Sequence, residues 1–331
     1  MVYQLKVVVY GASVTAQKGE SGYFQNLENI CDFEVVRIPF GASHLHLAGV
    51  AMLSKVLDEK PDVCILDWVT PSTKSFPSGV VDRINNILHQ HNIFPIWILL
   101  PRTDDIGSSR ISCMQIRAAA SQFVWVKTFI ESSFGRGVTV SNLLRDVVHT
   151  NSKGARLYSS FLFELLNDFR IRKFGSACLP KSVECEIKEV VPSIIEAHSV
   201  IKTDEPFLLR IVANKKCDLT IFLYCEIGPN SPILKVSLKK NGELVASSKK
   251  NVVDPWCYYS RYMLIDLPTI YSLGAGEYEI DICTLDLNPF DTISTLKPIE
   301  KQYSLDNNNR FLKLQEIIVD KNVNLKVNNE L

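Results

Sequence analysis

Three residues in the first half of the chain have side chains that together can carry out acyl transfer. Ser13 follows an apolar run at 7–10 and Gly11, while Asp146 and His149 stand three residues apart before a stretch of helical periodicity. A serine hydroxyl is a weak nucleophile unless an imidazole accepts its proton and a carboxylate orients that imidazole. Side chains at i and i+3 on one turn can point the same way. We therefore predict Ser13 as nucleophile, His149 as general base and Asp146 as the orienting carboxylate.

Each of these residues also has a simpler interpretation. Ser13 can be a turn residue, His149 a capping or surface residue, and Asp146 a favourable charge at a helix N-terminus. Their combination with the order of the surrounding elements favours catalysis, because open α/β sheets place their sites at the carboxyl ends of the strands.

The first half of the chain alternates short apolar runs with helical periods, which is typical of a parallel sheet covered on both faces. The spacing predicts strands at 6–10, 33–38, 63–67, 94–100 and 123–127, and helices at 23–30, 45–57, 79–91 and 109–121. A longer helix follows, with Thr150 or Asn151 as its cap. Its predicted buried stripe consists of Leu157, Tyr158, Phe161, Leu162, Leu165 and Phe169.

After residue 175 the period changes to about two, which predicts strands rather than helices. We expect strands at 183–191, 207–213, 219–226, 233–238, 243–247, 262–267 and 278–285, with an Asn241-Gly242 hairpin between two of them. Short strands joined by turns indicate an antiparallel β-sandwich. The segment from 306 is polar and rich in asparagine, with one short element expected at 311–319.

The predicted organisation is therefore α/β followed by all-β. We expect a catalytic domain at 1–175, a β-sandwich at 176–305 that is accessory or binds carbohydrate, and a polar C-terminal tail at 306–331. A chain of 331 residues is long enough for two domains, each with its own core.

Composition argues against several classes of partner. The 36 basic and 36 acidic residues leave no basic field for nucleic acid or an anionic membrane. The first residues lack the pattern of a signal peptide, and the apolar stretch at 93–101 is too short to span a bilayer. Nine cysteines, an odd number without a C-x-x-C, disfavour a zinc site or a disulfide framework. We expect a cytoplasmic protein without a transmembrane segment.

The chemistry-bearing residues resemble the conserved blocks of a known family, the SGNH or GDSL hydrolases. Gly11-Ala12-Ser13 resembles the first block, which usually reads Gly-Asp-Ser, and Asp146 with His149 resembles the Asp-x-x-His of the last. This resemblance covers residues 5–172 and implies a flavodoxin-like three-layer fold with esterase or acyltransferase activity. Residues 11–17, 22–23 and 145–150 further resemble the SGNH domains of bacterial surface-polysaccharide biosynthesis.

The same resemblance implies the donors of an oxyanion hole, each able to lower an acyl-transfer barrier by about 3 kcal/mol. In the family these are the N–H of the serine, a glycine N–H after the second strand and an asparagine after the third. Ser13 and Gly41 match the first two. The third block departs from the family, since no asparagine follows the third strand, and Thr70 or Ser72 is the predicted replacement. Ala12 also stands where the family usually has aspartate.

Other residues are candidates for contact with substrate. His44 and Arg102 follow the second and fourth predicted strands, at the edge where we expect the site. His44 and His46 alternate, but no third ligand at a recognisable spacing accompanies them, so we expect no metal and no bound cofactor. In the second half, Trp256, Tyr258 and Tyr259 can stack on a sugar or pack in the sandwich core.

Taken together, the residues and the resemblance predict serine-dependent transfer of an acyl group, acetyl in the first instance, to or from a carbohydrate. The subgroup resemblance favours an O-acetyltransferase of surface-polysaccharide biosynthesis. Its acyl-donor substrate would be acetyl-CoA, and its partners the acceptor or acylated carbohydrate and other biosynthetic proteins. Two alternatives stay open: a carbohydrate O-acetylesterase, and a catalytically weakened SGNH-like protein that binds carbohydrate or acts as a scaffold.

Overall fold

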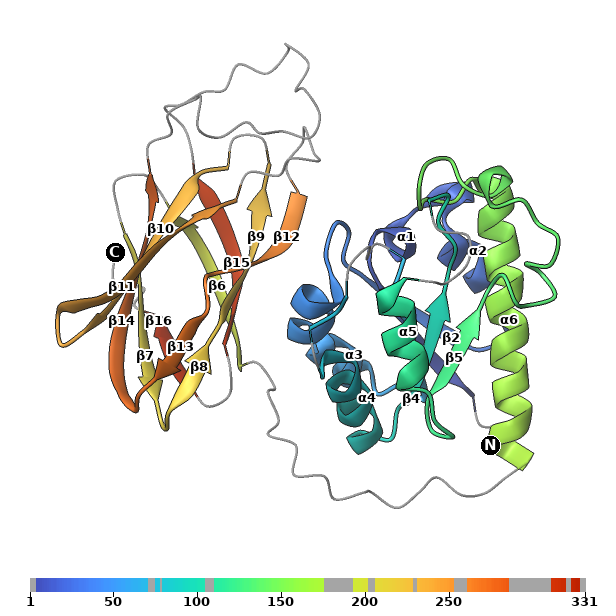
Figure 1. The fold of residues 1–331 in the computed structure, drawn as a ribbon, viewed down its shortest axis with the longest axis horizontal. Coiled ribbons are helices and arrows are strands. Elements are labelled where there is room, and N and C mark those ends of the chain that lie inside the picture. The colour runs from blue at the N-terminus through green and yellow to red at the C-terminus, as the bar shows by residue number, and fades with distance from the viewer. Residues whose placement is uncertain are drawn as a thin grey trace, which may run out of the picture. The chain divides into compact units, whose positions relative to one another are not determined.

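The chain divides into two compact units, Met1–Lys188 and Glu189–Leu331, each with its own sheet structure. The computed structural model describes residues 4–70, 75–77, 79–104, 110–175, 193–201, 206–228, 231–252, 261–285, 311–319 and 323–327. The two units are shown in Figure 1 and are described one at a time.

The first unit is built on a five-stranded parallel sheet in the order β2-β1-β3-β4-β5. The strands are β1 (Lys6–Gly11), β2 (Glu34–Pro39), β3 (Val63–Asp67), β4 (Phe94–Leu99) and β5 (Trp125–Thr128). The helices are α1 (Ser13–Ala16), α2 (Tyr23–Ile30), α3 (Leu53–Glu59), α4 (Val80–Gln90), α5 (Ile111–Ala118) and α6 (Ser152–Gly175). Short helical turns occupy Gly19–Ser21, Leu45–Gly49 and Val140–Asn142. This is the α/β class with the flavodoxin-like strand order that the sequence predicts.

The sheet is buried on both faces, which explains why its central strands are continuously apolar. On one face, alternate residues of β1, β3 and β4 pack into a core with α2 and α6. On the other, the Tyr10 ring meets Trp68 edge to face, and the Trp97 Nε1–H donates to Asn85 Oδ1 of α4 at 2.8 Å. Figure 1 shows α2 and α6 on one side of the sheet and α3 and α4 on the other. Helices therefore cover both faces of the sheet, as the sequence predicts.

One predicted helix of the first unit differs in form from the observed chain. The stretch expected as a single helix at 45–57 is a π-helical turn at Leu45–Gly49 followed by α3. The turn fits tightly around a buried tryptophan, since a Cβ added to Gly49 would lie 2.8 Å from Leu45 Cδ1 and 3.4 Å from the Trp68 ring. Packing around Trp68 therefore interrupts the regular helix that the apolar spacing suggests.

The second unit is an antiparallel β-sandwich. One sheet has the order β11-β10-β14-β7-β16, the other β12-β9-β15-β6, and β13 pairs with β8. The bounds are β6 (Ser193–Ile201), β7 (Phe207–Ala213), β8 (Cys217–Leu219), β9 (Ile221–Ile227), β10 (Ile233–Lys240), β11 (Glu243–Asn251), β12 (Arg261–Asp266), β13 (Ile270–Leu273), β14 (Gly276–Leu285), β15 (Leu312–Val319) and β16 (Val323–Val327). Asn241 and Gly242 both have positive φ, as the predicted two-residue hairpin between β10 and β11 requires.

The extent of the sandwich differs from the sequence prediction at its C-terminal boundary. The predicted tail at 306–331 contains β15, a central strand of one sheet, and β16, an edge strand of the other. The apolar side chains of Leu312, Leu314 and Ile317 in β15 are buried in the sandwich core. The element expected at 311–319 is therefore present as β15, while its place in the sandwich was not predicted. The strand expected at 183–191 and the first boundary at 175/176 fall in or beside residues 176–192, which lie outside the described residues.

Two further findings bear on the sequence predictions. The expected stripe on α6 is confirmed, with Tyr158, Phe161 and Leu162 buried in the core of the first unit. Within the described part of the chain, no helix is both long and apolar enough to cross a membrane.

The first turn of α6 packs tightly against the chain that precedes it. Asn151 Oδ1 accepts the Gly154 N–H at 3.0 Å and so caps the helix, one of the two caps the sequence predicts. A Cβ added to Gly154 would overlap the Leu143 carbonyl oxygen and lie 3.0 Å from its carbon. Gly154 therefore lets the segment carrying Asp146 and His149 lie directly on α6.

We predict that Gly154→Ala lowers the free energy of unfolding by about 1–3 kcal/mol, although alanine is the better helix former. The steric overlap with Leu143 outweighs the gain in helix propensity. Chemical denaturation measures the change. The control is Lys153→Ala, because Lys153 directly precedes Gly154 in the same turn and its side chain is exposed. The control should change stability by less than about 0.5 kcal/mol. Equal stability of Gly154→Ala and the native protein would contradict the proposed packing.

Candidate active site

Ser13 lies in a tight turn at the carboxyl end of β1. The strand ends at Gly11, and Ser13 is the first residue of α1. The Ala12 N–H donates to the Asp67 carbonyl oxygen at 3.1 Å, which holds the turn to the end of β3. A Cβ on Gly11 would lie 2.7 Å from that same oxygen and would overlap Thr15 Oγ1. Glycine at position 11 thus allows the close approach that leaves Ser13 partly exposed at the sheet edge.

Asp146 and His149 lie at the tip of a short closed loop, residues 145–150, here called the histidine loop. An antiparallel bridge between Leu144 and Thr150 closes its base. The Arg145 N–H donates to the His149 carbonyl at 2.8 Å, and the Asn151 N–H donates to the Leu143 carbonyl at 2.9 Å. The pair predicted from the sequence therefore sits on a hydrogen-bonded turn rather than on a helix.

The structure brings the Asp146 carboxylate and the His149 ring into direct contact. Nδ1 of His149 lies 2.9 Å from Asp146 Oδ2 and 3.1 Å from Oδ1. Oδ1 also accepts the backbone N–H groups of His149, at 2.8 Å, and Val148, at 3.0 Å. A proton on Nδ1 that is donated to the carboxylate leaves Nε2 as the acceptor, as a general base requires.

The electrostatics of Asp146 suit this role. Partial desolvation raises the pKa of its carboxyl group, but hydrogen bonds from the His149 and Val148 amides and from the His149 ring lower it by more. The net pKa lies below its usual value, so the carboxylate stays ionised in mildly acidic solution.

Two contacts bring the histidine loop to the edge of the sheet where Ser13 lies. The side chain of Gln17, just after α1, forms hydrogen bonds with Thr150, the residue after His149. The Thr103 N–H, shortly after β4, donates to the Val147 carbonyl at 3.0 Å. The ends of β1 and β4 and the histidine loop therefore form one hydrogen-bonded region at the carboxyl edge of the sheet.

Asp67, at the end of β3, is a buried carboxylate that the sequence did not single out. Its Oδ2 accepts the Thr15 hydroxyl at 2.8 Å and the Tyr23 hydroxyl at 3.1 Å, and its Oδ1 accepts the Thr70 hydroxyl at 2.8 Å. Burial raises the pKa of Asp67 more than these three hydrogen bonds lower it. The carboxylate links α1, α2 and the chain after β3 directly behind the Ser13 turn.

The geometry of Thr70 bears on its predicted role as an oxyanion donor. Thr70 is fully buried, and the single proton of its hydroxyl is donated to Asp67. An oxyanion contact from that hydroxyl requires a different arrangement from the one observed. The other predicted hydroxyl, Ser72, lies outside the described residues.

Gly41 and His44 follow β2, beside the nucleophile turn. The Phe40 N–H donates to the Gly11 carbonyl at 2.8 Å, and a Cβ on Gly41 would lie 3.9 Å from Ala16 Cβ of α1. The His44 ring is exposed and stacks on His46 with centroids 5.6 Å apart. Partial desolvation, and secondly the His46 imidazole, lower the pKa of His44. Both predicted residues therefore lie on the β2 side of the same edge.

Arg102, predicted to contact substrate, is buried and engaged in contacts within the protein. Its Nε and Nη2 form a two-point ion pair with Asp104, at 2.6 and 2.8 Å, and its Nη1 donates to the Thr70 carbonyl at 2.9 Å. Arg110 donates to the carbonyls of Val69 and Leu100. The observed role of both guanidinium groups is to hold the chain after β3, and contact of Arg102 with substrate stays a prediction.

The described residues contain no group of three or more His, Cys, Asp or Glu side chains arranged to hold a metal ion. His44 and His46 thus form a stacked pair rather than part of a ligand cluster in that portion of the chain.

These elements define the class of fold: the first unit is an α/β domain on a five-stranded parallel sheet, and the second is an antiparallel β-sandwich. No protein-family model and no curated protein sequence matches the chain. Among solved structures, the chain is similar over both units to a two-domain esterase (CEX) active on acetylated mannans. The TM-score is 0.62 at 10% sequence identity, covering 96% of this chain and 91% of that one.

Two other solved structures give context. The same kind of esterase co-crystallised with mannopentaose matches with a TM-score of 0.60 at 10% identity, covering 96% of this chain and 90% of the other. A putative lipolytic protein of the G-D-S-L family from Desulfitobacterium hafniense DCB-2 covers 49% of this chain and 99% of its own, at 19% identity and a TM-score of 0.40. At these identities the likeness concerns the fold.

We predict that Thr70→Val lowers stability by about 1–3 kcal/mol, because it removes a hydrogen bond to a buried carboxylate. We expect kcat for hydrolysis of an acetyl ester to fall less than tenfold, since the native hydroxyl donates to Asp67. Denaturation and steady-state kinetics on the same variant measure the two effects. A loss of about 10²-fold or more in kcat, with little loss of stability, would instead support the oxyanion role predicted from the sequence.

Proposed function

We propose that the first domain is a serine esterase that removes an acyl group, acetyl in the first instance, from a carbohydrate. The observation that carries this proposal is the Asp146–His149 pair, with His149 Nδ1 held by the carboxylate and the loop joined to the Ser13 turn through Thr150. A positioned acid, base and nucleophile at the carboxyl edge of an α/β sheet are the requirements of acyl transfer through a covalent intermediate.

In the proposed reaction, Ser13 Oγ attacks the ester carbonyl carbon while His149 Nε2 takes the hydroxyl proton. The backbone N–H groups of Ser13 and Gly41 stabilise the negative charge on the carbonyl oxygen. The bond between the acyl carbon and the sugar oxygen then breaks, and the imidazolium gives its proton to that oxygen, which leaves as a hydroxyl group of the sugar. Water, giving a proton to His149, attacks the acyl carbon; the bond to Ser13 Oγ breaks, the imidazolium returns the proton to Oγ, and acetate leaves.

Hydrolysis is favoured over the acetyl transfer expected from the subgroup resemblance. Support comes from the match over both units to an esterase described as active on acetylated mannans. Acetyl transfer differs in one step, in which a sugar hydroxyl replaces water as the attacking group. Acetyl-CoA, supplied with an unacetylated oligosaccharide, therefore tests that alternative directly.

We predict that Ser13→Ala reduces acetate release from acetylated manno-oligosaccharides by about 10³–10⁶-fold, and that Asp146→Asn reduces it by about 10²–10⁴-fold. The first change removes the nucleophile. The second removes the charge that selects the His149 tautomer. Acetate release and oligosaccharide mass are followed together, and intact mass detects acetylated Ser13.

The matched controls are Ser160→Ala on α6 and His91→Ala at the C-terminal end of α4, which should leave turnover within about twofold of the native rate. Unchanged turnover in Ser13→Ala would refute the mechanism. A gain of acetyl mass on the unacetylated oligosaccharide in the presence of acetyl-CoA would make the protein a transferase.

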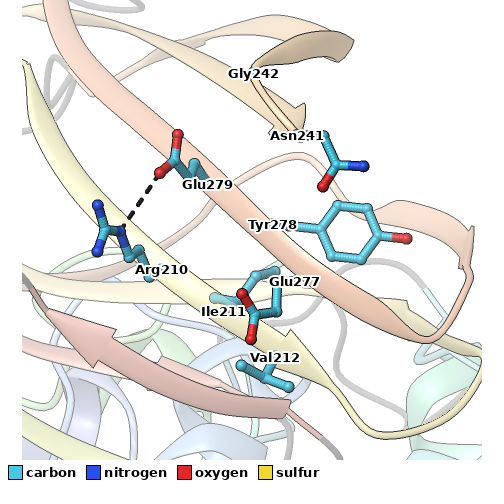
Figure 2. A pocket seen from close by; sticks show the side chains of 8 residues that line it. All are labelled: Arg210, Ile211, Val212, Asn241, Gly242, Glu277, Tyr278 and Glu279. Atoms are coloured by element: carbon cyan, nitrogen blue, oxygen red, sulfur yellow. Dashed lines mark ion pairs between the residues drawn. The ribbon is translucent and has the colours of Figure 1, made fainter.

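A second candidate function concerns the sandwich, where a specific pocket favours carbohydrate binding. The pocket has a volume of about 420 Å³, within the range of small-molecule sites, and is lined by residues of β7, β14 and the β10–β11 turn. Figure 2 shows Arg210 beside Glu279, with Asn241 and Tyr278 on the opposite side. The aromatic residues predicted to stack on sugar, Trp256, Tyr258 and Tyr259, lie outside the described residues.

The polar groups of this pocket suit the hydroxyls of a sugar. Arg210 Nε lies 3.4 Å from Glu279 Oε1, so a donor and an acceptor stand side by side, and both side chains are about half exposed. Glu277 adds an exposed carboxylate, and Asn241 adds an amide with both donor and acceptor atoms. Vicinal hydroxyls both donate and accept, so they can pair with such neighbouring groups at once. We propose that this pocket binds a neutral oligosaccharide.

We predict that Glu277→Ala weakens binding of mannopentaose by about tenfold, as expected for loss of a charged hydrogen-bond partner. Calorimetric titration of each protein with mannopentaose, which carries no acyl group to be hydrolysed, measures the affinities. Lys235→Ala is the control, because Lys235 is exposed on β10 and does not line the pocket. Equal affinities of the native, Glu277→Ala and Lys235→Ala proteins would place any binding elsewhere.

A further inference from the structure

The side chain of Gln17 forms a two-way contact with Thr150 across 133 residues of sequence. Its Oε1 accepts the Thr150 N–H at 3.1 Å, and its Nε2 donates to the Thr150 carbonyl at 3.1 Å. The Thr150 hydroxyl, with a single proton to donate, lies between two acceptors, Gln17 Oε1 at 3.0 Å and the Ser21 carbonyl at 2.7 Å. The side-chain amide of Gln17 therefore pairs with both backbone polar groups of Thr150, its N–H and its carbonyl, as a neighbouring β-strand would. We call this contact the Gln17 clamp.

The clamp is shielded from water. Gln17 is 8% exposed and Thr150 is fully buried, so competition from solvent is slight. Further contacts fix both of its sides. The Thr150 hydroxyl lies 2.7 Å from the Ser21 carbonyl, and Arg37 Nη1 donates to the Gln17 carbonyl at 3.0 Å. The amide can therefore move only if its surroundings rearrange.

The clamp joins the two halves of the candidate site. Gln17 is the residue directly after α1, whose first residue is Ser13, and Thr150 directly follows His149. The parallel strands fix only the points at which the loops carrying Ser13 and His149 begin. The distance between the Ser13 and His149 side chains therefore depends on contacts between the loops themselves.

We propose that Gln17 is a positioning residue that sets the distance between Ser13 Oγ and His149 Nε2. This inference rests on the proposed esterase function and adds a residue with no proton-transfer role of its own. Proton transfer from serine to imidazole requires heavy-atom separations of about 2.6–3.2 Å, and a displacement of about 1 Å can cost about 10² in rate. Loss of the clamp therefore affects kcat more than substrate affinity.

The chain contains a matched control for this inference. Gln115 on α5 makes the same two-way contact with Phe76, accepting its N–H at 2.7 Å and donating to its carbonyl at 2.9 Å. That contact joins two segments that carry none of Ser13, Asp146 and His149. Gln17→Met and Gln115→Met both replace a hydrogen-bonded amide by an apolar side chain of similar shape, the first at a buried position and the second at a partly buried one.

The test compares these two variants in the full chain, using kcat and KM on acetylated manno-oligosaccharides and the rate at which a fluorophosphonate labels Ser13. We expect Gln17→Met to lower kcat and the labelling rate about tenfold to hundredfold, with KM within about twofold. Gln115→Met should lower stability similarly and leave kcat and labelling within about twofold. Gln17→Asn keeps an amide but shortens the side chain by one methylene, so it should also lower kcat, and it serves where Gln17→Met does not fold.

Amide hydrogen exchange provides a readout that needs no activity. Exchange of the Thr150 N–H should accelerate at least tenfold in Gln17→Met and stay unchanged in Gln115→Met. Unchanged exchange at Thr150, or equal losses of kcat in both glutamine variants, would overturn the positioning role. Native turnover that survives in Ser13→Ala would overturn the esterase proposal instead, whatever the exchange result at Thr150.

Discussion

The buried carboxylate of Asp67 is the interaction on which the architecture of the candidate site depends. A desolvated charge is costly unless hydrogen bonds compensate it, and three hydroxyls, from Thr15, Tyr23 and Thr70, do so here. Since these hydroxyls belong to three different segments, satisfying one carboxylate fixes the position of all three. The main chain of Asp67 adds a fourth contact through its carbonyl and the Ala12 N–H. The turn that presents Ser13 therefore rests on a polar network rather than on apolar packing alone.

Most of the secondary structure of the first unit could be predicted from the sequence, because it depends on local pattern. β3 coincides with its predicted range, and its five residues are all buried, so the apolar run was a direct signal of a central parallel strand. The Asp146–His149 pair was equally visible, since three residues separate the two side chains. Asp67 gave no comparable signal. As the last residue of an apolar run, it resembled an ordinary strand end, and its three partners come from positions before and after it.

Several features of the structure depend on contacts that the local sequence does not show. Arg102 follows a strand at the expected edge, but its partners, Asp104 and the Thr70 carbonyl, are set by the path of the loops. Likewise, β15 belongs to the sandwich because it pairs with β9 and β6, far away in sequence. The sequence predicts an element at 311–319 and a strand at 219–226 but does not show that the two pair, and β6 is not among the predicted strands. The local sequence pattern thus shows which residues are suited to burial or to hydrogen bonding. The tertiary structure determines which partners pack against them or bond to them.

The candidate site is held by a series of contacts in which each fixes the next. Two backbone amides of the histidine loop bind Asp146 Oδ1, so the carboxylate is oriented by the loop even without the imidazole. The carboxylate then orients the His149 ring through Nδ1. The orientation of the imidazole is therefore no better defined than the position of the loop as a whole. The loop is in turn held by Gln17 on one side and by Thr103 on the other. It follows that precision in the proton transfer does not come from the three reacting side chains alone. It requires that the loops be joined at more than one point, because a single contact would leave the histidine loop free to rotate about it.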